Sequence, residues 1–318
     1  MKLRGKSELV VGRCPASLCN PIVKELKNNY VLFLIAIPGI LFYILFAYMP
    51  IYGAIIAFKD YSPGLGIMGS PWVGLKHFKD FFSDVYFGRA VKNTIILNFY
   101  LIVFGFPAPV ILALLLNELK LKHFKRTVQT ISYMPHFISM VVICGMIVDF
   151  TSSKGVLTNL LHSLGFDYGN LLQEANLFRG IYVISDIWQS IGWGSIIYLA
   201  ALSGIDAQLY EAAEIDGAGK LKQLMHVTLP GIIPTFIIML IMRVGGIMSL
   251  GADKVILLYN PVTYETADVI SSLVYRRGLI ESDQSFATAV GLFNSVINFA
   301  LVYMTNLISR KLSGSSLW

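Results

Sequence analysis

Residues 211–230 read EAAEIDGAGKLKQLMHVTLP and lie between two strongly apolar stretches of the chain. Asp206, shortly before them, is placed to cap a helix over Ala207–Ile215, because an aspartate side chain accepts hydrogen bonds from the free N–H groups of a first helical turn. Gly217 and Gly219 then permit a sharp change of direction. The segment therefore predicts a short, stiff helix held outside the bilayer, where another protein can contact it.

The second half of this segment predicts how the loop joins the next apolar stretch. A second helix is expected over 220–227, and Pro230 is expected to begin the next apolar helix, because proline suits a first helical turn. Ala212 and Ala213 leave a smooth surface that another protein can approach closely. Glu211 offers a carboxylate to an arginine or lysine of that protein.

The composition of the chain is that of a membrane protein. Of its 318 residues, 55% are apolar and only 14% are charged, and the mean hydropathy is +0.66. An average soluble domain has about 25% charged residues. Several apolar runs exceed about 20 residues, which is enough to cross a hydrocarbon core of about 30 Å. Since the alternating ten-residue segments of a membrane barrel are absent from the sequence, we predict an all-α polytopic protein.

Six transmembrane helices are predicted from the apolar runs. They are expected over 30–57, 93–117, 127–150, 180–203, 231–252 and 286–309. The third contains Ser132, Pro135 and His136, so it is expected to pack against other helices rather than face lipid. These spans make up one membrane domain over 30–309, with the loop 204–230 inside it. Tails at 1–29 and 310–318 flank the domain.

The distribution of Lys and Arg predicts the orientation of the spans. Fourteen of the 25 basic residues lie in four segments with a smaller total length, and ten lie in the three intervening segments. The richer segments are 1–29, 118–126, 204–230 and 310–318. Because basic residues gather in cytoplasmic segments, both termini and the 204–230 loop are expected in the cytoplasm. The net charge of +6 is therefore attributed to topology rather than to nucleic-acid binding.

One amphipathic helix is predicted outside the spans. Trp72, Leu75, Phe78, Phe82 and Tyr86 recur at helical spacing with charged residues between them. This pattern is typical of a helix that lies at the outer membrane interface. The stretch 22–26 is expected to do the same on the cytoplasmic side.

The loop pattern resembles that of a known transporter family. It consists of Glu-Ala-Ala, three residues, Gly, nine residues, an aliphatic residue, any residue, and Leu-Pro. It resembles the EAA loop of ABC-importer permeases, and only Val227 departs from the isoleucine usual there. The sequences YMPHFIS at 133–139, YNPVTYETADVI at 259–270 and YRRGL at 275–279 are similar to carbohydrate-uptake permeases, above all to the LplB-type subgroup for oligosaccharides and uronate-containing polysaccharide fragments.

The resemblance implies a type I ABC importer permease fold in a bacterial cell membrane. It implies that a coupling helix docks in a cleft of a cytoplasmic ATPase, through Glu211, Ala212, Ala213, Asp216 and Gly217. It also implies a second homologous permease, two copies of the ATPase, and an extracytoplasmic solute-binding protein. The sequence contains no G-x-x-x-x-G-K-[ST] motif. The chain is therefore expected to be a transporter subunit rather than an enzyme, with ATP and magnesium held by the partner ATPase.

Polar groups inside the spans are costly and therefore mark a candidate pathway for the sugar. Aromatic faces stack on sugar rings, while carboxylate, amide and guanidinium groups hydrogen-bond the hydroxyls. The candidates are Asp186, Trp188, Gln189, Trp193, Arg243, Asn294 and Asn298.

Each candidate also has a structural interpretation that stays open. Trp188 is equally well explained as an interface anchor. Asn294 and Asn298 lie four residues apart and can hydrogen-bond one helix to another. Asp186 and Arg243 are expected at similar membrane depth and can form an ion pair. Our hypothesis is that Arg243 faces the translocation cavity, because a guanidinium binds a carboxylate through two hydrogen bonds.

Two other functional classes predict different sequence features. An ion-coupled secondary transporter of a small polar solute predicts inverted repeats and carboxylates at the membrane midplane, for which Asp186 alone is weak support. A membrane enzyme predicts a cluster of catalytic groups, but the five histidines are scattered along the chain. Cys14 and Cys19 have no histidine or third cysteine nearby, so no metal site is predicted.

Overall fold

The computed structural model describes residues 29–314, 316 and 317. The predictions for Cys14, Cys19 and the stretch 22–26 therefore lie outside the described residues. Within the described part, the regular structure is helical apart from one isolated β-bridge between Lys59 and Trp72. The chain divides into two compact units, one ending at Ala54 and the other beginning at Ile55.

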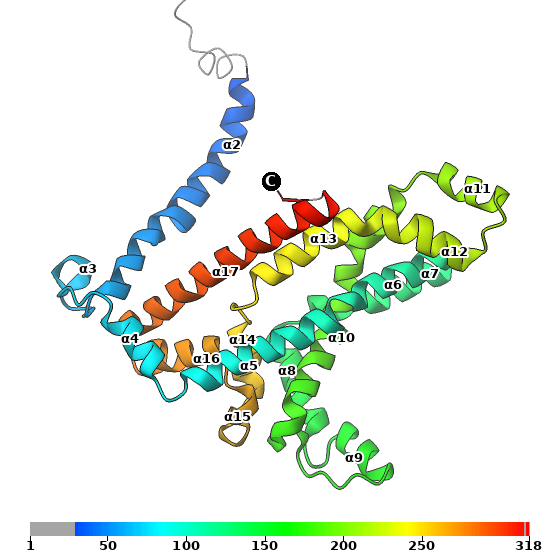
Figure 1. Cartoon of the computed structure of the whole chain (residues 1–318). Helices are drawn as coiled ribbons and strands as arrows, with labels where there is room; N and C mark the ends of the chain where they lie inside the picture. Colours follow the sequence, from blue (N-terminus) through cyan, green and yellow to red (C-terminus); the bar gives the residue numbers. More distant parts are fainter. Residues whose placement is uncertain (1–28, 315, 318) are drawn as a thin grey trace, which may run out of the picture. The chain divides into compact units, whose positions relative to one another are not determined.

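The helices of the described residues follow one another along the chain (Figure 1). They are α2 (Tyr30–Tyr43), α3 (Gly66–Gly69), α4 (Lys76–Ser83), α5 (Phe87–Tyr100), α6 (Pro107–Glu118), α7 (Lys122–Tyr133), α8 (Met140–Thr151), α9 (Val156–Ser163), α10 (Ala175–Ser203), α11 (Ala207–Ile215), α12 (Lys220–Gln223), α13 (Leu229–Gly245), α14 (Ala252–Leu258), α15 (Tyr264–Ala267), α16 (Ile270–Tyr275) and α17 (Gln284–Ser313).

Among the described residues, five helical segments are long and apolar enough to cross a membrane, and a sixth is counted when α10 and α11, bent by 68°, are taken together. The five are Tyr30–Phe58, Phe87–Glu118, Met140–Ser163, Lys220–Gly245 and Gln284–Lys311. The prediction of an all-α protein with six spans agrees with the upper count. Several predicted boundaries were wrong, and each error has a physical cause.

The predicted third span, 127–150, is broken in the structure. α7 ends at Tyr133, and a 3-10 turn that contains Pro135 separates it from α8. Ser139 then begins a new helix, because its hydroxyl oxygen accepts a hydrogen bond from the Val142 N–H. The membrane-length apolar segment therefore begins at Met140 rather than near residue 127.

The predicted fifth span, 231–252, is too long at its C-terminal end. α13 ends at Gly245, and residues 246–251 are not helical. Side chains from distant helices replace the missing helical hydrogen bonds. The Asn98 amide donates to the Ile247 carbonyl at 2.7 Å, and the Asn298 side-chain oxygen accepts from the Met248 N–H at 3.0 Å. Irregular backbone at membrane depth requires such partners.

Pro230 lies in the first turn of α13, as predicted, but no break separates α13 from the helix before it. The segment from Lys220 to Gly245 is one continuous helical stretch, in which a π-helical turn over Leu224–Thr228 joins α12 to α13. Pro230 has no N–H to donate and its ring crowds the preceding turn, and π turns accommodate such disruptions inside helices. The second helix of the loop is thus the beginning of the next span.

Three clusters of buried side chains hold the larger unit together, and α10 contributes to two of them. Near its N-terminal end, Phe178 and Tyr182 pack with residues of α5, α8 and α14. Near its C-terminal end, Tyr198 and Leu202 pack with α6 and α13. At Gly192 a Cβ atom would collide with the backbone carbonyl of Ser132, so this position of α10 requires glycine.

The third cluster joins α4 to α16 and α17, and it corrects the predicted amphipathic helix. Only Lys76–Ser83 is helical, and its buried residues are His77 and Phe81. Leu75 and Phe82 are 59% and 52% exposed, and that they face the membrane interface stays a prediction. Phe81, which the pattern did not include, makes edge-on aromatic contacts with residues of α17.

A buried ionic cluster connects α5, α15 and α16. The Asp268 carboxylate is fully buried and accepts hydrogen bonds from Arg89 at 2.9 Å, from Arg276 at 2.7 and 2.8 Å, and from the Ser272 hydroxyl at 2.8 Å. Burial alone would raise the pKa of Asp268, but these hydrogen bonds outweigh it and hold the pKa below its usual value. Asp268 is therefore an anion at neutral pH, and it is the counter-charge of both Arg89 and Arg276.

Candidate functional site

The loop helix α11 forms as its capping residues predict. The Asp206 carboxylate accepts from the Gln208 N–H at 2.9 Å, and the helix spans Ala207–Ile215 as expected. At its end, Gly217 has a φ of +73°. The Gly217 N–H donates to the Glu214 carbonyl at 3.0 Å and the Ala218 N–H donates to the Ala213 carbonyl at 2.8 Å. This pair of bonds is common where a helix ends at a glycine with a positive φ. The N–H groups of that glycine and of the next residue pair with the last free carbonyls of the helix.

The surface of α11 is open to contact by another protein. The helix has no buried residues, and Glu211 is exposed. The apolar side chains of Leu209 and Ile215 are 54% and 86% exposed. These exposed side chains are available for contact with another protein.

A hydrogen bond links α11 to the helix that enters the membrane. The Tyr210 hydroxyl lies 3.0 Å from the Thr228 hydroxyl, which belongs to the π-helical turn before α13. At the other side of the loop, Lys220 pairs with Glu118 at the end of α6 at 2.7 Å. That pair is solvent-exposed and contributes little stability. Sequence reasoning missed the Tyr210–Thr228 link, because the two residues lie 18 positions apart and belong to no motif.

Asp186 and Arg243 line the same cavity, which has a volume of 300 Å³. α10 supplies Asp186 and α13 supplies Arg243, while residues of α6 and of the turn before it close the wall. The other polar groups of the lining are the hydroxyls of Ser190 and Tyr198. The structure thus brings together the two charged residues that the sequence placed at similar depth.

The ion-pair partner of Asp186 is Lys254 rather than Arg243. The two charged groups lie 3.6 Å apart, and the Lys254 side chain is 3% exposed. Lys254 also donates to the Tyr182 carbonyl at 3.2 Å. The Arg243 guanidinium has no hydrogen-bond or ion-pair partner among the residues the structure describes. Sequence reasoning missed Lys254, because it assigned that residue to an outer loop.

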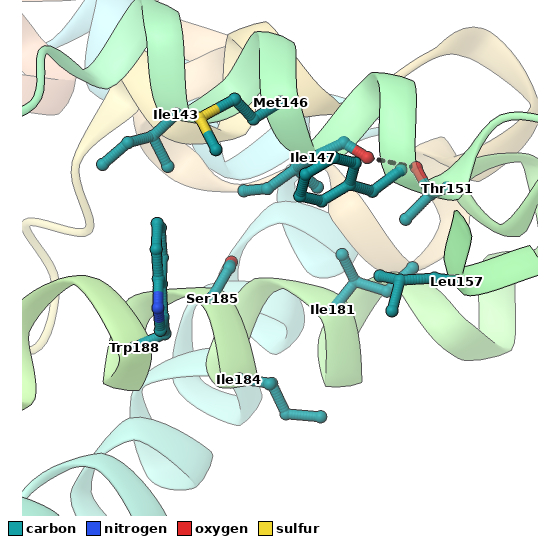
Figure 2. Close-up of a pocket in the computed structure, with 10 residues that line it drawn as sticks. Ile143, Met146, Ile147, Thr151, Leu157, Ile181, Ile184, Ser185 and Trp188 are labelled. Carbon is teal, nitrogen blue, oxygen red and sulfur yellow. Dashed lines mark hydrogen bonds between the residues drawn. The ribbon is translucent and has the colours of Figure 1, made fainter. Parts of the chain in front are cut away.

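The two tryptophans lie away from this cavity. Trp188 lines an apolar cavity of 370 Å³ between α8 and α10, where Figure 2 shows it with Ile143 and Met146. Trp193 stacks on the His136 ring with centroids 4.6 Å apart. Gln189 is partly buried and lines none of the cavities described here. Residues close together on α10 therefore face different surroundings, because a helix turns through 100° at each residue.

Asn294 and Asn298 also separate in the structure. Asn298 uses both ends of its amide on the irregular segment 246–251, since it accepts from the Met248 N–H and donates to the Ser249 hydroxyl at 2.7 Å. Asn294 lines a cavity of 610 Å³ beside α16 and α17. In the described part of the chain, no group of three His, Cys, Asp or Glu side chains is arranged to hold a metal ion.

Comparison with protein families gives a match over most of the chain. Residues 81–314 match the family described as binding-protein-dependent transport system inner membrane component. Protein LplB of Bacillus subtilis (strain 168) is 42% identical over 294 residues, which are 92% of this chain and 92% of LplB. The polygalacturonan/rhamnogalacturonan transport system permease protein YteP of the same organism is 41% identical over 291 residues, which cover 91% of this chain and 90% of YteP.

Solved structures give a similar match. One is the crystal structure of a bacterial alginate ABC transporter in complex with alginate pentasaccharide-bound periplasmic protein. A chain of it matches with a TM-score of 0.85 and 40% identity, over 94% of this chain and 100% of that chain. A chain from a bacterial ABC transporter involved in the import of the acidic polysaccharide alginate matches with a TM-score of 0.84 and 41% identity, over 92% and 100% of the two chains.

Proposed function

This chain belongs to the binding-protein-dependent transport system inner membrane component family, and on that premise we propose that its importer takes up an acidic oligosaccharide or polysaccharide fragment. The resemblance predicted from the loop motif is confirmed, and the chain is a multi-pass ABC-transporter permease. Two observations support the acidic substrate. A similar solved chain belongs to a transporter of an acidic polysaccharide, and Arg243 presents an unpaired cation to a membrane cavity.

The path from the loop to the cavity supports a mechanical role for α11. A docked ATPase would move α11, and the Tyr210–Thr228 hydrogen bond carries that movement to the base of α13. From Thr228, the helix runs without a break to Arg243, a distance of about 22 Å at 1.5 Å per residue. Closure of the ATPase around ATP would thus change the position of Arg243, as in domain movements that expose a site alternately to the two sides.

The proposed transporter needs three further kinds of subunit, namely an ATPase, a second permease and a binding protein. Its sequence has no phosphate-binding loop, so ATP and magnesium belong to the two ATPase subunits. We place α11 and both termini in the cytoplasm, in agreement with the distribution of basic residues. A second permease would complete the translocation pathway, and an extracytoplasmic binding protein would deliver the saccharide.

The proposed function has a direct test in proteoliposomes. The purified complex of this chain with its partner permease and ATPase is expected to import saccharide only when the binding protein and ATP are both supplied. Ionophores that abolish proton and sodium gradients are expected to leave uptake unchanged. Uptake that requires an ion gradient but not ATP would contradict the proposal and favour a secondary transporter.

Arg243→Gln tests the proposed contact with acidic sugars. We expect the KM for an acidic oligosaccharide to rise about 10- to 100-fold, because a charge-assisted hydrogen bond contributes about 1.5–3 kcal/mol. The KM for a neutral oligosaccharide of the same length should change by less than about threefold. Arg243→Lys should give an intermediate KM, because it keeps the charge but loses the planar guanidinium that binds a carboxylate through two hydrogen bonds. An equal loss for both saccharides, together with poor assembly of the complex, would instead assign Arg243 a structural role.

A further inference from the structure

The cavity that contains Arg243 also contains a carboxylate. Asp186 and Arg243 are the charged residues of its lining among the residues that the structure describes. The Asp186 side chain is 31% exposed and lines the cavity, so an occupant can contact it. A carboxylate in this position repels an acidic sugar and competes with it for the guanidinium. The cavity therefore favours an acidic sugar only if another cation compensates Asp186.

Lys254 supplies this compensating charge from outside the cavity lining. Its ammonium lies 3.6 Å from the Asp186 carboxylate, and its side chain is 3% exposed. The ammonium also donates to the Tyr182 carbonyl at 3.2 Å and lies over the Tyr182 ring, 4.8 Å from the centroid. Asp186 is its acidic partner among the described residues. Lys254 is therefore held next to Asp186, and its burial keeps it out of contact with the sugar.

Asp186 depends on Lys254 for its counter-charge. The Ser190 hydroxyl, one helical turn away, donates to the Asp186 backbone carbonyl at 2.6 Å rather than to the carboxylate. Arg243 lines the same cavity but forms no ion pair with Asp186 in the described structure. These two cations and one anion leave one positive charge in excess, and that charge belongs to Arg243. Without Lys254 the excess would disappear, and Asp186 would be left with Arg243 as the cation that shares its cavity.

We propose that Lys254 is a positioning residue for substrate selection, which holds the Asp186 carboxylate in an ion pair and so leaves the Arg243 guanidinium free for the carboxylate of an acidic saccharide. The inference rests on the proposed function and deepens it, because it names the group that makes this site cationic. Ionisable residues inside a membrane protein usually pair with one another. Here the choice of pair decides which cation remains available to the sugar.

Lys254→Met tests this role, because methionine keeps part of the apolar stem of lysine and removes its charge. In the assembled importer, the KM for an acidic oligosaccharide is expected to rise by about tenfold or more, since Asp186 then repels the sugar and competes for Arg243. The KM for a neutral oligosaccharide of the same length and the maximal uptake rate should change by less than about threefold. Lys154→Met is the matched control, because Lys154 is exposed and forms no ion pair among the described residues. It should leave both KM values unchanged.

A double variant, Asp186→Asn with Lys254→Met, separates compensation of charge from a structural role. It removes both charges of the pair and keeps that of Arg243. The KM for the acidic oligosaccharide is expected to return to within about threefold of the unmodified importer. This rescue can be measured even if the single variant does not assemble. If the double variant keeps a tenfold higher KM for the acidic saccharide alone, Lys254 attracts the sugar by its own charge, and the proposal is overturned.

Two further results would overturn the proposal. An equal loss for acidic and neutral saccharides in both variants would show that the pair only stabilises the packing of α14 against α10. An unchanged KM for the acidic saccharide in Lys254→Met would show that Asp186 does not compete for Arg243. The unmodified importer separates these results from a failure of the proposed function. If it shows no preference for acidic over neutral oligosaccharides, the proposed substrate class is contradicted. If it shows that preference and Lys254→Met keeps it, the role of Lys254 alone is contradicted.

Discussion

Asp268→Asn is expected to lower the free energy of unfolding by about 3 kcal/mol, because it leaves two arginines without their buried counter-charge. Removing one member of a buried ion pair costs about 3–5 kcal/mol, and the lower end applies because the side chains of Arg89 and Arg276 are 30% and 19% exposed. The asparagine side chain also cannot accept all the hydrogen bonds that Arg89 and Arg276 now donate to the two carboxylate oxygens. Thermal and chemical unfolding of the detergent-solubilised complex would measure the change.

The control and the pH dependence make this prediction specific. Asp167→Asn replaces a side chain that is fully exposed, and it should leave the unfolding temperature nearly unchanged. The folded pKa of Asp268 lies below its ordinary value of 3.8, so its stabilisation is fully present above that pH and is lost as the pH falls through the folded pKa. The difference between the Asp268 variant and the unmodified chain should therefore stay constant near neutral pH. A loss below about 1 kcal/mol would show that the ionic cluster does not stabilise the fold.

Gly217→Pro is expected to reduce saccharide uptake by more than tenfold while the membrane spans stay folded. The backbone at Gly217 has a φ of +73°, whereas proline is restricted to about −65°. The substitution also removes the N–H that donates to Glu214 at the end of α11. The helix end would have to rearrange, and the surface that carries Glu211 would lose its orientation toward the ATPase.

The measurement for Gly217→Pro separates coupling from folding. ATPase activity of the complex should no longer respond to saccharide-loaded binding protein, or the ATPase should dissociate, while the unfolding temperature of the membrane part stays within a few degrees of normal. Gly219→Ala is the matched control, because Gly219 has a φ of −65° and open space around its Cα atom. Normal uptake by the Gly217 variant would defeat the assignment of α11 as the coupling helix.

The features predicted correctly from the sequence depend on local chemistry. The bounds of α11 follow from a capping aspartate and from a glycine that can adopt a positive φ, and both signals lie within a few residues of the helix. The number of spans follows from apolar length, because a bilayer imposes a minimum length on each helix separately. The loop motif is likewise a local pattern, and it was sufficient to predict the family.

The features that were missed or wrongly placed depend on contacts between distant parts of the chain. Residues 246–251 leave the helix because Asn98 and Asn298, from two other helices, supply hydrogen bonds that the bilayer cannot. Lys254, rather than Arg243, pairs with Asp186, because the irregular segment lets α14 reach the wall of α10.

The sequence by itself therefore determined the fold class, the family and the bounds of the loop helix α11. Only the tertiary structure decided which of the polar residues share a cavity, which satisfy backbone groups, and which stay unpaired. The physical reason is that a helix position defines a direction but not a neighbour. The neighbour is set by how the helices pack, and a polar group within the membrane is stabilised only where another helix offers it a partner.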